Sequence, residues 1–291
     1  MPLRFLHCSD IHLLSLVGVG PHRFLNKRLT GGINLMLARG RHHSERLFDR
    51  MVEHARELEL DRVVVTGDLS NLSLDEEFEH IVRKLEAIGL PVTVIPGNHD
   101  AYTRASVRKR RFEHHFGQYM QGERLGEDDE HFYPFVQRYG EVALIGVSTA
   151  QVSLPLYAIG SVGPAQLSRL DQMLQALGQD ALVRVVLIHH PVLPGTSKPR
   201  HDLTDIDAFA EVIARRGAEL ILHGHEHTMI AGELVGPERP VPVHGISSAT
   251  NLSQRPGRAA AFSVYEVARA GIERTLWRWD GEDFRPSPDA G

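Results

Sequence analysis

The sequence has almost no cysteine and no long apolar run. Cys8 is its only cysteine in 291 residues, which excludes an intrachain disulfide and a zinc site built from cysteine thiolates. We expect Cys8 to be a small buried strand residue. Nowhere do about 18 apolar residues follow one another, the length that a membrane-spanning helix needs. The start, "MPLRFLHCSD", lacks a basic segment before a long apolar one, so we expect no signal peptide and a cytoplasmic protein.

The sequence also lacks an excess of positive charge. Its 32 lysines and arginines face 37 acidic residues, for a net charge of −5, so we expect no stable nucleic-acid binding. With 42% hydrophobic and 24% charged residues, the composition is that of a soluble globular protein with a sizeable core. We find no internal repeat and no low-complexity linker. These absences predict a single domain over residues 1–279, followed by a flexible C-terminal tail over residues 280–291.

Short apolar runs alternate with amphipathic segments along the chain. Residues 3–8 predict a buried strand, 44–58 a helix, 61–68 a strand and turn, 75–89 a helix, and 91–100 a strand and loop. The later elements are strands within 132–149, a helix at 163–178, a strand at 182–191, a helix at 205–217, a strand at 218–227, and short strands at 229–235, 241–247, 260–267 and 272–278. This alternation predicts an α/β fold with adjacent buried strands.

Side chains that can bind metal follow the ends of five predicted strands. They are Asp10, Asp68, Asn98, His189 and His225. In open α/β sheets the ligand site lies outside the carboxyl ends of the strands. The eighteen histidines of this chain are therefore of interest mainly where they occupy such ends.

Five short motifs hold these residues and their neighbours. The motifs are "DIH" (10–12), "GDLSN" (67–71), "GNHD" (97–100), "HHP" (189–191) and "HGHEH" (223–227). Asp10 and His12 are two residues apart, so an extended chain would direct both side chains to one side. Imidazole and carboxylate ligands without sulfur suit Mn²⁺, Fe²⁺, Zn²⁺ or Mg²⁺. The motifs therefore predict a metal site.

In this order, the motifs D-x-H, G-D, G-N-H-[DE], H and G-H-x-H resemble those of the calcineurin-like metallophosphoesterases. They cover residues 10–227 and are most similar to the bacterial 3′,5′-cyclic-nucleotide phosphodiesterase branch. The resemblance implies a four-layer α-β-β-α sandwich that holds two divalent metal ions, Mn, Fe or Zn. It implies that Asp10, His12 and His227 bind the first metal, that Asp68 bridges both, and that Asn98, His189 and His225 bind the second.

The resemblance also implies a mechanism. A metal-bridging hydroxide would attack phosphorus in line with the leaving oxygen. His99 would lie beside the phosphate and stabilise or protonate the leaving oxygen, and Asp100 would orient His99. Every motif residue is present, which argues for an active enzyme.

Other polar residues near the motifs have simpler interpretations. We expect His190 to be a polar lining residue, His223 to be a strand-end histidine with a local hydrogen bond, and Glu226 to be a spacer that points away. Four further histidines occur in pairs, and no acidic residue lies at a spacing from them that would indicate a metal or catalytic site. We expect them to be solvated: His42, His43, His114 and His115.

The insert over residues 13–43 contains no acidic residue. Its five positive charges are Arg23, Lys27, Arg28, Arg39 and Arg41, and leucines and other apolar residues lie between them. It directly follows the first motif, so we expect it at the rim of the site. A basic and apolar segment is typical of peripheral contact with an anionic membrane surface. It is equally typical of a helical cap that packs its apolar face on the domain. Both interpretations favour an anionic phosphoester as substrate.

Three functions remain open at this point. The first is a metal-dependent phosphodiesterase. The second is a pyrophosphatase for a lipid-linked nucleotide sugar, similar to the UDP-2,3-diacylglucosamine hydrolases, although those enzymes commonly carry their lipid-binding insert after the G-N-H motif. The third is a non-catalytic metal-dependent scaffold, although such relatives usually lose ligands and this chain has lost none.

Overall fold

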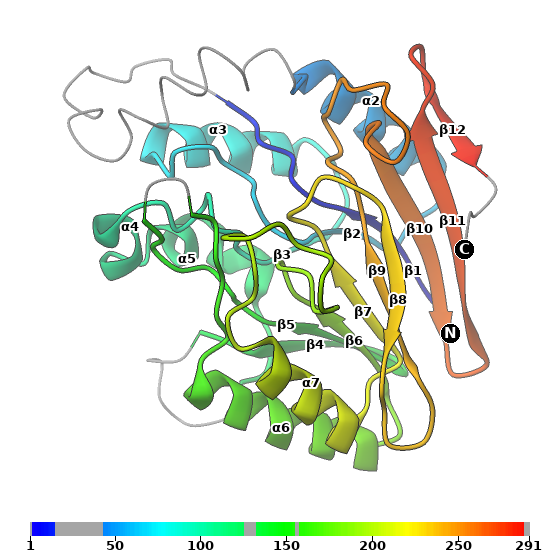
Figure 1. Cartoon of the computed structure of the whole chain (residues 1–291). Coiled ribbons are helices and arrows are strands. Elements are labelled where there is room, and N and C mark those ends of the chain that lie inside the picture. Colours follow the sequence, from blue (N-terminus) through cyan, green and yellow to red (C-terminus); the bar gives the residue numbers. More distant parts are fainter. Residues whose placement is uncertain (1, 15–42, 125–131, 155–156, 288–291) are drawn as a thin grey trace.

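The computed structural model describes residues 2–14, 43–124, 132–154 and 157–287, and in it two sheets lie between helices (Figure 1). The first sheet has the order β12-β11-β10-β1-β2-β3 and the second β4-β5-β6-β7-β9-β8. The strands of the first sheet are β1 (Leu3–Cys8), β2 (Arg62–Val65), β3 (Val92–Val94), β10 (Ala261–Ala268), β11 (Gly271–Trp279) and β12 (Phe284–Ser287). Those of the second are β4 (Phe135–Tyr139), β5 (Val142–Gly146), β6 (Val183–Leu187), β7 (Leu220–His223), β8 (Ile230–Leu234) and β9 (Val241–Gly245).

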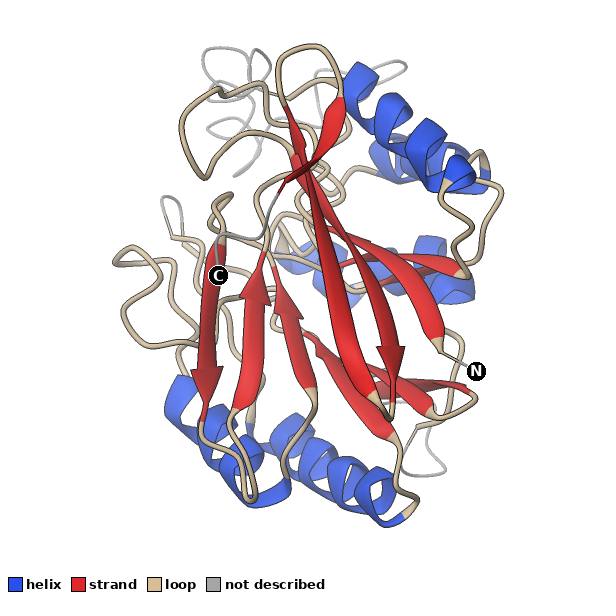
Figure 2. Ribbon diagram, turned by 90° about the vertical axis from the view of Figure 1, so that its right-hand side faces the viewer, coloured by secondary structure: helices blue, strands red, loops and turns tan. Residues whose placement is uncertain are grey.

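Helices cover the outer face of each sheet (Figure 2). They are α2 (Glu45–Glu57), α3 (Asp75–Glu86), α4 (Arg104–Arg108), α5 (Arg111–Phe116), α6 (Pro164–Gln179) and α7 (Ile206–Arg216), with the 3-10 helix η3 at Gly117–Met120. One apolar cluster, which includes Phe5 of β1 and Leu187 of β6, joins the two sheets, and a second joins Val186 of β6 to the helices α6 and α7. The predicted four-layer α-β-β-α sandwich is confirmed.

Fully buried apolar strands explain why the site can form where it does. β2 has the sequence RVVV, and all four of its residues are buried, as is typical of parallel strands covered on both faces. β1, β2 and β3 pair in parallel, and so do β5, β6 and β7. The carboxyl ends of the strands in each group therefore lie at one edge of their sheet.

The structure corrects the expectation of a flexible tail over residues 280–291. Within that range β12 pairs antiparallel with β11, and Phe284 is fully buried. Asp283 accepts hydrogen bonds from Arg50 on α2. The expectation is therefore wrong for residues 284–287, because an aromatic anchor and an ion pair hold this edge strand.

The structure bears only partly on two other expectations, the absence of a membrane-spanning helix and the role of the insert. No helix in the described parts of the chain has both the length and the apolar character that crossing a membrane requires. A cytoplasmic location stays a prediction. Residues 15–42 of the basic and apolar insert lie outside the described residues.

His7 of β1 is a buried histidine in the first sheet that belongs to none of the five motifs. It is 1% exposed, its Nε2 lies 2.9 Å from Thr66 Oγ1, and its Nδ1 has no partner among the described residues. Burial, and then the charge of Arg274, lower the pKa of His7 well below its ordinary value. The folded protein therefore keeps His7 neutral.

We expect His7 to make the protein sensitive to acid. The unfolded chain protonates this histidine below about pH 6.5, so its contribution to stability falls by up to about 2 kcal/mol between pH 7 and pH 5. His7→Asn should flatten the pH dependence of the free energy of unfolding, measured by urea denaturation at both pH values. His114→Asn, at an exposed histidine, is the matched control. An equal pH dependence in wild type and His7→Asn would contradict this account.

Candidate metal centre

The five strand ends deliver their side chains to one place. β1, β2 and β3 end at Cys8, Val65 and Val94, and β6 and β7 end at Leu187 and His223. The expected metal-binding residues follow each of these ends by two to four positions: Asp10, Asp68, Asn98, His189 and His225. Their donor atoms form two groups that share one residue.

The first group consists of Asp10, His12, Asp68 and His227, whose donor atoms all lie within 4.8 Å of one another. His12 Nε2 lies 3.2 Å from His227 Nε2 and 3.7 Å from Asp68 Oδ2, and His227 Nε2 lies 3.1 Å from Asp10 Oδ1. Asp10 Oδ1 is buried and accepts no hydrogen bond from the described residues. A buried carboxylate oxygen in this state fits a cation as its partner.

The second group consists of Asp68, His189 and His225. His189 Nε2 lies 3.5 Å from Asp68 Oδ1, 3.3 Å from His225 Nδ1 and 3.3 Å from the side-chain oxygen of Asn98. Asp68 thus faces the first group with Oδ2 and the second with Oδ1. One carboxylate lies between two sets of donors.

Backbone carbonyls set the tautomers of the imidazoles in the second group. His189 Nδ1 lies 2.7 Å from the carbonyl of Thr66, and His225 Nε2 lies 3.0 Å from that of His201. A carbonyl only accepts, so these nitrogens carry the protons of the neutral rings. The bare nitrogens, His189 Nε2 and His225 Nδ1, then face each other at 3.3 Å, which is repulsive unless a positive charge lies between them.

The electrostatics lead to the same conclusion. Burial lowers the pKa of His189, but the Asp68 carboxylate outweighs it and raises that pKa to about 9, so in the metal-free chain Nε2 takes up a proton, the positive charge that a bound cation would replace. Burial lowers the pKa of His12 and of His225 well below the ordinary value, which keeps both rings in the neutral form that binds metal. Burial alone would raise the pKa of Asp68, yet His189 and His99 lower it well below the ordinary range. The donor set fits a pair of cations.

Strained backbone accompanies this arrangement. The φ angles of Asp10, His12, Asp68, His225 and His227 are 54°, 42°, 52°, 75° and 51°, in the left-handed region. Such conformations cost of order 1–3 kcal/mol each in residues other than glycine, and they cluster at functional sites. The surrounding structure therefore holds these five side chains in turns that their sequence alone disfavours.

Two glycines allow the strand ends to approach one another. A Cβ atom at Gly97 would overlap Asp68 Oδ1, and one at Gly224 would overlap Ser9 Oγ and Asp10 Oδ2. The motifs "GNHD" and "HGHEH" need glycine at these positions because the carboxylates of Asp68 and Asp10 occupy the space that a side chain would fill.

We expect Gly97→Ala to displace the Asp68 carboxylate. Overpacking of this kind typically costs about 1–3 kcal/mol of stability, and metal affinity should fall with it. Urea denaturation and a metal titration measure the two effects. Gly271→Ala is the control, because a Cβ at Gly271 meets nothing within 4 Å. Wild-type stability and affinity in Gly97→Ala would show that the carboxylate can move freely.

Asp100 holds the two loops that carry Asp68 and Asn98. Its carboxylate accepts hydrogen bonds from the backbone N–H groups of Gly97, Leu69 and Ser70, at 2.9, 3.1 and 2.9 Å, and from the Ser70 hydroxyl. Burial, and then the charge of Asp68, raise the pKa of Asp100 to about 7.

His99 has its own contacts, which differ from the expectation that Asp100 orients its ring. Its Nδ1 lies 2.9 Å from the carbonyl of Asn71, to which the Nδ1–H donates, and its backbone N–H donates to Asp68 Oδ1 at 2.8 Å. The contacts of Asp100 within the described residues are with loop backbone and Ser70. Asp100 therefore contacts the loop that carries His99, and the His99 ring contacts the carbonyl of Asn71.

Two histidines next to the candidate ligands have the local contacts that we expected. His190 is fully buried, with Nδ1 2.6 Å from Thr149 Oγ1 and Nε2 3.0 Å from the carbonyl of Ala158. His223 Nδ1 lies 3.1 Å from the carbonyl of Gly224. The His190 ring lies beside that of His225, with 4.1 Å between centroids, and neither His190 nor His223 belongs to a donor group found in the described part of the chain.

Glu226 does not point away as expected. It is 6% exposed, and its Oε1 lies 3.6 Å from His201 Nδ1 and 4.0 Å from His225 Nε2. The expectation assumed an extended chain, whereas the positive φ of His225 makes a turn that directs Glu226 inward. Glu226 thereby anchors residue 201, whose carbonyl sets the tautomer of His225.

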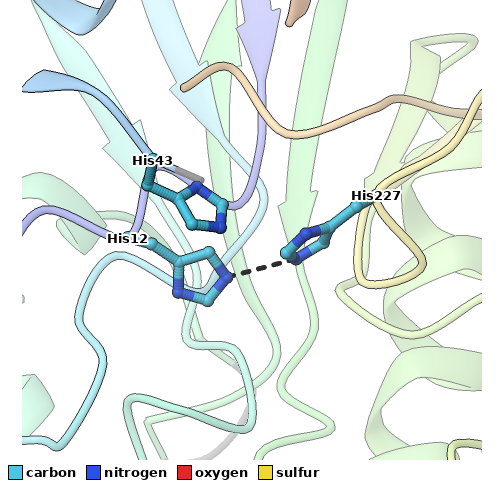
Figure 3. A group of neighbouring side chains, drawn as sticks. All are labelled: His12, His43 and His227. Carbon is cyan, nitrogen blue, oxygen red and sulfur yellow. Dashed lines mark hydrogen bonds between the residues drawn. The ribbon is translucent and has the colours of Figure 1, made fainter. Parts of the chain in front are cut away.

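His43 is a site residue that the sequence analysis missed. Its ring centroid lies 4.8 Å from that of His12 and 5.5 Å from that of His227 (Figure 3). Of the other paired histidines, His114 is exposed as expected, but His115 is half-buried beside Asp75, at 3.3 Å. His42 lies outside the described residues. The sequence around His43 contains no local pattern that indicates a site residue, because the residues that His43 contacts lie in distant segments of the chain.

Known proteins share both sequence and fold with this chain. It is 28% identical over 184 residues to the 3′,5′-cyclic adenosine monophosphate phosphodiesterase of Haemophilus influenzae, which covers 61% of this chain and 58% of that protein. It is 30% identical over 170 residues to a probable cyclic nucleotide phosphodiesterase of Synechococcus sp., with 57% and 58% covered. The matched region thus spans 58% of the length of each relative.

Solved structures show the same fold. A dimetal phosphatase from Danio rerio superposes with a TM-score of 0.63 at 14% identity, covering 98% of both chains. A purple acid phosphatase from yellow lupin seeds gives 0.65 at 10% identity, covering 98% of this chain and 53% of that one. The family model of the calcineurin-like phosphoesterases matches residues 3–229. The chain therefore belongs to the calcineurin-like phosphoesterase family.

Proposed function

We propose that the chain is a binuclear-metal phosphodiesterase. The observation that carries the proposal is the shared position of Asp68, whose two oxygens face two separate groups of donors. Two-metal sites of this kind act on phosphoesters in many enzymes.

The residues for each position follow from the two groups. Asp10, His12 and His227 would hold one metal, Asn98, His189 and His225 the other, and Asp68 both. When bound, the metals supply Lewis-acid charge for the phosphoryl oxygens and a nucleophile derived from water at neutral pH. Nitrogen and oxygen donors without sulfur suit Mn²⁺, Fe²⁺ or Zn²⁺.

His99 supplies the proton in this proposal. Because its Nδ1–H donates to the carbonyl of Asn71, Nε2 is the nitrogen that can carry a transferable proton. The His99 ring lies edge-on to His12, at 5.1 Å between centroids, and thus beside the first group of donors. A histidine in this place can protonate the leaving oxygen as the P–O bond breaks.

Cyclic nucleotides are the first substrates to test. Both relatives are named as cyclic nucleotide phosphodiesterases. A 3′,5′-cyclic nucleotide is an anionic diester whose leaving group is a sugar hydroxyl, and a poor leaving group of this kind benefits most from a proton donor such as His99.

The experiment is turnover of diesters by the purified full chain with Mn²⁺. We expect hydrolysis of bis(p-nitrophenyl) phosphate, its loss on chelation and its return on adding metal. Cyclic AMP should then be a better substrate than a UDP-diacyl sugar. A metal-loaded protein that hydrolyses no diester would refute the proposal and leave the scaffold function.

The insert over residues 13–43 supports a separate proposal of peripheral contact with an anionic membrane surface, because its five basic residues lie among apolar ones. Co-sedimentation with anionic liposomes should fall when the insert is deleted. Equal failure of both proteins to sediment would rule out membrane contact.

A further inference from the structure

We infer that His43 is an additional nitrogen ligand at the first metal position, beside Asp10, His12 and His227. This inference rests on the two-metal centre proposed above. It adds a fifth ligand histidine to the four that the motifs supply: His12, His189, His225 and His227.

The position of His43 is the first argument. A donor nitrogen of His43 lies within 4.8 Å of those of His12 and His227, which are themselves 3.2 Å apart. Figure 3 shows that the ring nitrogen of His43 that is remote from its backbone points toward the space between the other two rings. Three imidazoles thus converge on one point.

The hydrogen bonds of His43 fix which nitrogen carries its proton. The Thr250 hydroxyl donates to the carbonyl of Ile11 at 2.9 Å, and the Ser248 hydroxyl donates to that of Asp10 at 2.6 Å. Each hydroxyl uses its only proton in that hydrogen bond. Thr250 Oγ1, at 2.8 Å, and Ser248 Oγ, at 3.3 Å, can therefore only accept a hydrogen bond from His43 Nδ1. The neutral ring therefore has its proton on Nδ1 and its lone pair on Nε2, the nitrogen that faces His12 and His227.

The backbone around His43 is held firmly enough for a ligand. His43 forms a β-bridge with Asn251, and the N–H of Ser44 donates to the carbonyl of Thr250 at 2.9 Å. The N–H of Ala249 donates in turn to the carbonyl of Ser9, next to Asp10, at 3.0 Å. The segment that orients His43 is thus tied to the strand end that carries the first ligand. Ligand geometry of this kind depends on such support.

A chemical asymmetry follows between the two positions. His43 forms one group of donors with His12 and His227, and the carboxylates of Asp10 and Asp68 form another with the same two imidazoles. The first position would therefore draw on three imidazoles and two carboxylates, whereas the second would have two imidazoles, the Asn98 amide and Asp68. A position richer in imidazole favours Zn²⁺ or Fe²⁺ over Mg²⁺ and Mn²⁺ more strongly. We therefore expect the first position to discriminate more sharply between these metals.

The test is calorimetric titration of the metal-free full chain with Zn²⁺. In His43→Gln we expect one of two association constants to fall on the order of ten- to a hundredfold while the other stays unchanged. His115→Gln, at a half-buried histidine beside Asp75, is the control and should match wild type. This result does not depend on turnover, so a protein that binds two metals but hydrolyses no diester would refute the proposed function alone.

A second measurement needs no variant. In ¹⁵N imidazole spectra of the wild-type protein, saturation with Zn²⁺ should shift the nitrogens of five histidines: His12, His43, His189, His225 and His227. A shift of only four, or unchanged association constants in a folded His43→Gln, would overturn the inference. A slower turnover with both constants unchanged would instead place His43 against the substrate.

Discussion

Asp68→Asn is expected to lose both metals and with them nearly all diesterase activity. The substitution keeps the shape of the side chain, so the hydrogen bond from the N–H of His99 to Oδ1 can persist. It removes the negative charge that both donor groups share. Two-metal catalysis contributes several kcal/mol to transition-state stabilisation, so kcat should fall by at least about 10³-fold. Metal content after dialysis and turnover of bis(p-nitrophenyl) phosphate measure the two losses.

The control for this prediction is Asp171→Asn on α6. Asp171 also pairs with cations, Arg215 and Arg216, but it lies on an outer helix. It should keep both metals and full turnover. Full metal content and activity in Asp68→Asn would mean that Asp68 does not bridge, and loss of one metal alone would assign it to a single position.

The fold and most of the site can be predicted because buried strands leave a strong local signal. Strands such as β2 and β6 are short, apolar and followed by turns that contain polar side chains. Once several such strands are parallel, their ends must meet, whatever the sequence between them. This is why the sequence alone predicts that Asp10, Asp68 and His189 lie together.

The route by which the side chains converge could not be predicted. The sequence predicts an extended chain that carries Asp10 and His12 to one side, but both residues have positive φ and therefore do not lie in an extended chain. The same departure from extended structure explains why Glu226 turns inward. Non-glycine residues adopt such angles only when tertiary contacts impose them, so periodicity does not reveal them.

Contacts between distant segments were equally hidden. His43 is oriented by Thr250, 207 positions away, and Asp283 joins Arg50 across 233 positions. Neither pair has a spacing that a local pattern could detect. The ring of His43 and the strand β12 therefore needed the structure, whereas the five motifs did not.

His99→Ala is expected to keep both metals and to slow turnover according to the leaving group. His99 belongs to no donor group among the described residues, so the metals should remain. Its loss removes the proton donor, an effect typically worth about 10²–10⁴-fold. The full effect should appear with cyclic AMP, whose sugar hydroxyl leaves poorly, and little of it with bis(p-nitrophenyl) phosphate, whose nitrophenolate leaves without a proton.

The contacts of His99 decide how this result is read. Its backbone N–H, which donates to Asp68 Oδ1, survives the substitution, so Asp68 keeps its support. The ring contacts with His12 and Tyr102 are lost, and a metal titration shows whether their loss disturbs the first position. Equal slowing of both substrates with normal metal content would assign His99 to binding the phosphate in the ground and transition states rather than to proton transfer. A loss confined to the poor leaving group is the signature of a general acid, because only that substrate needs the proton.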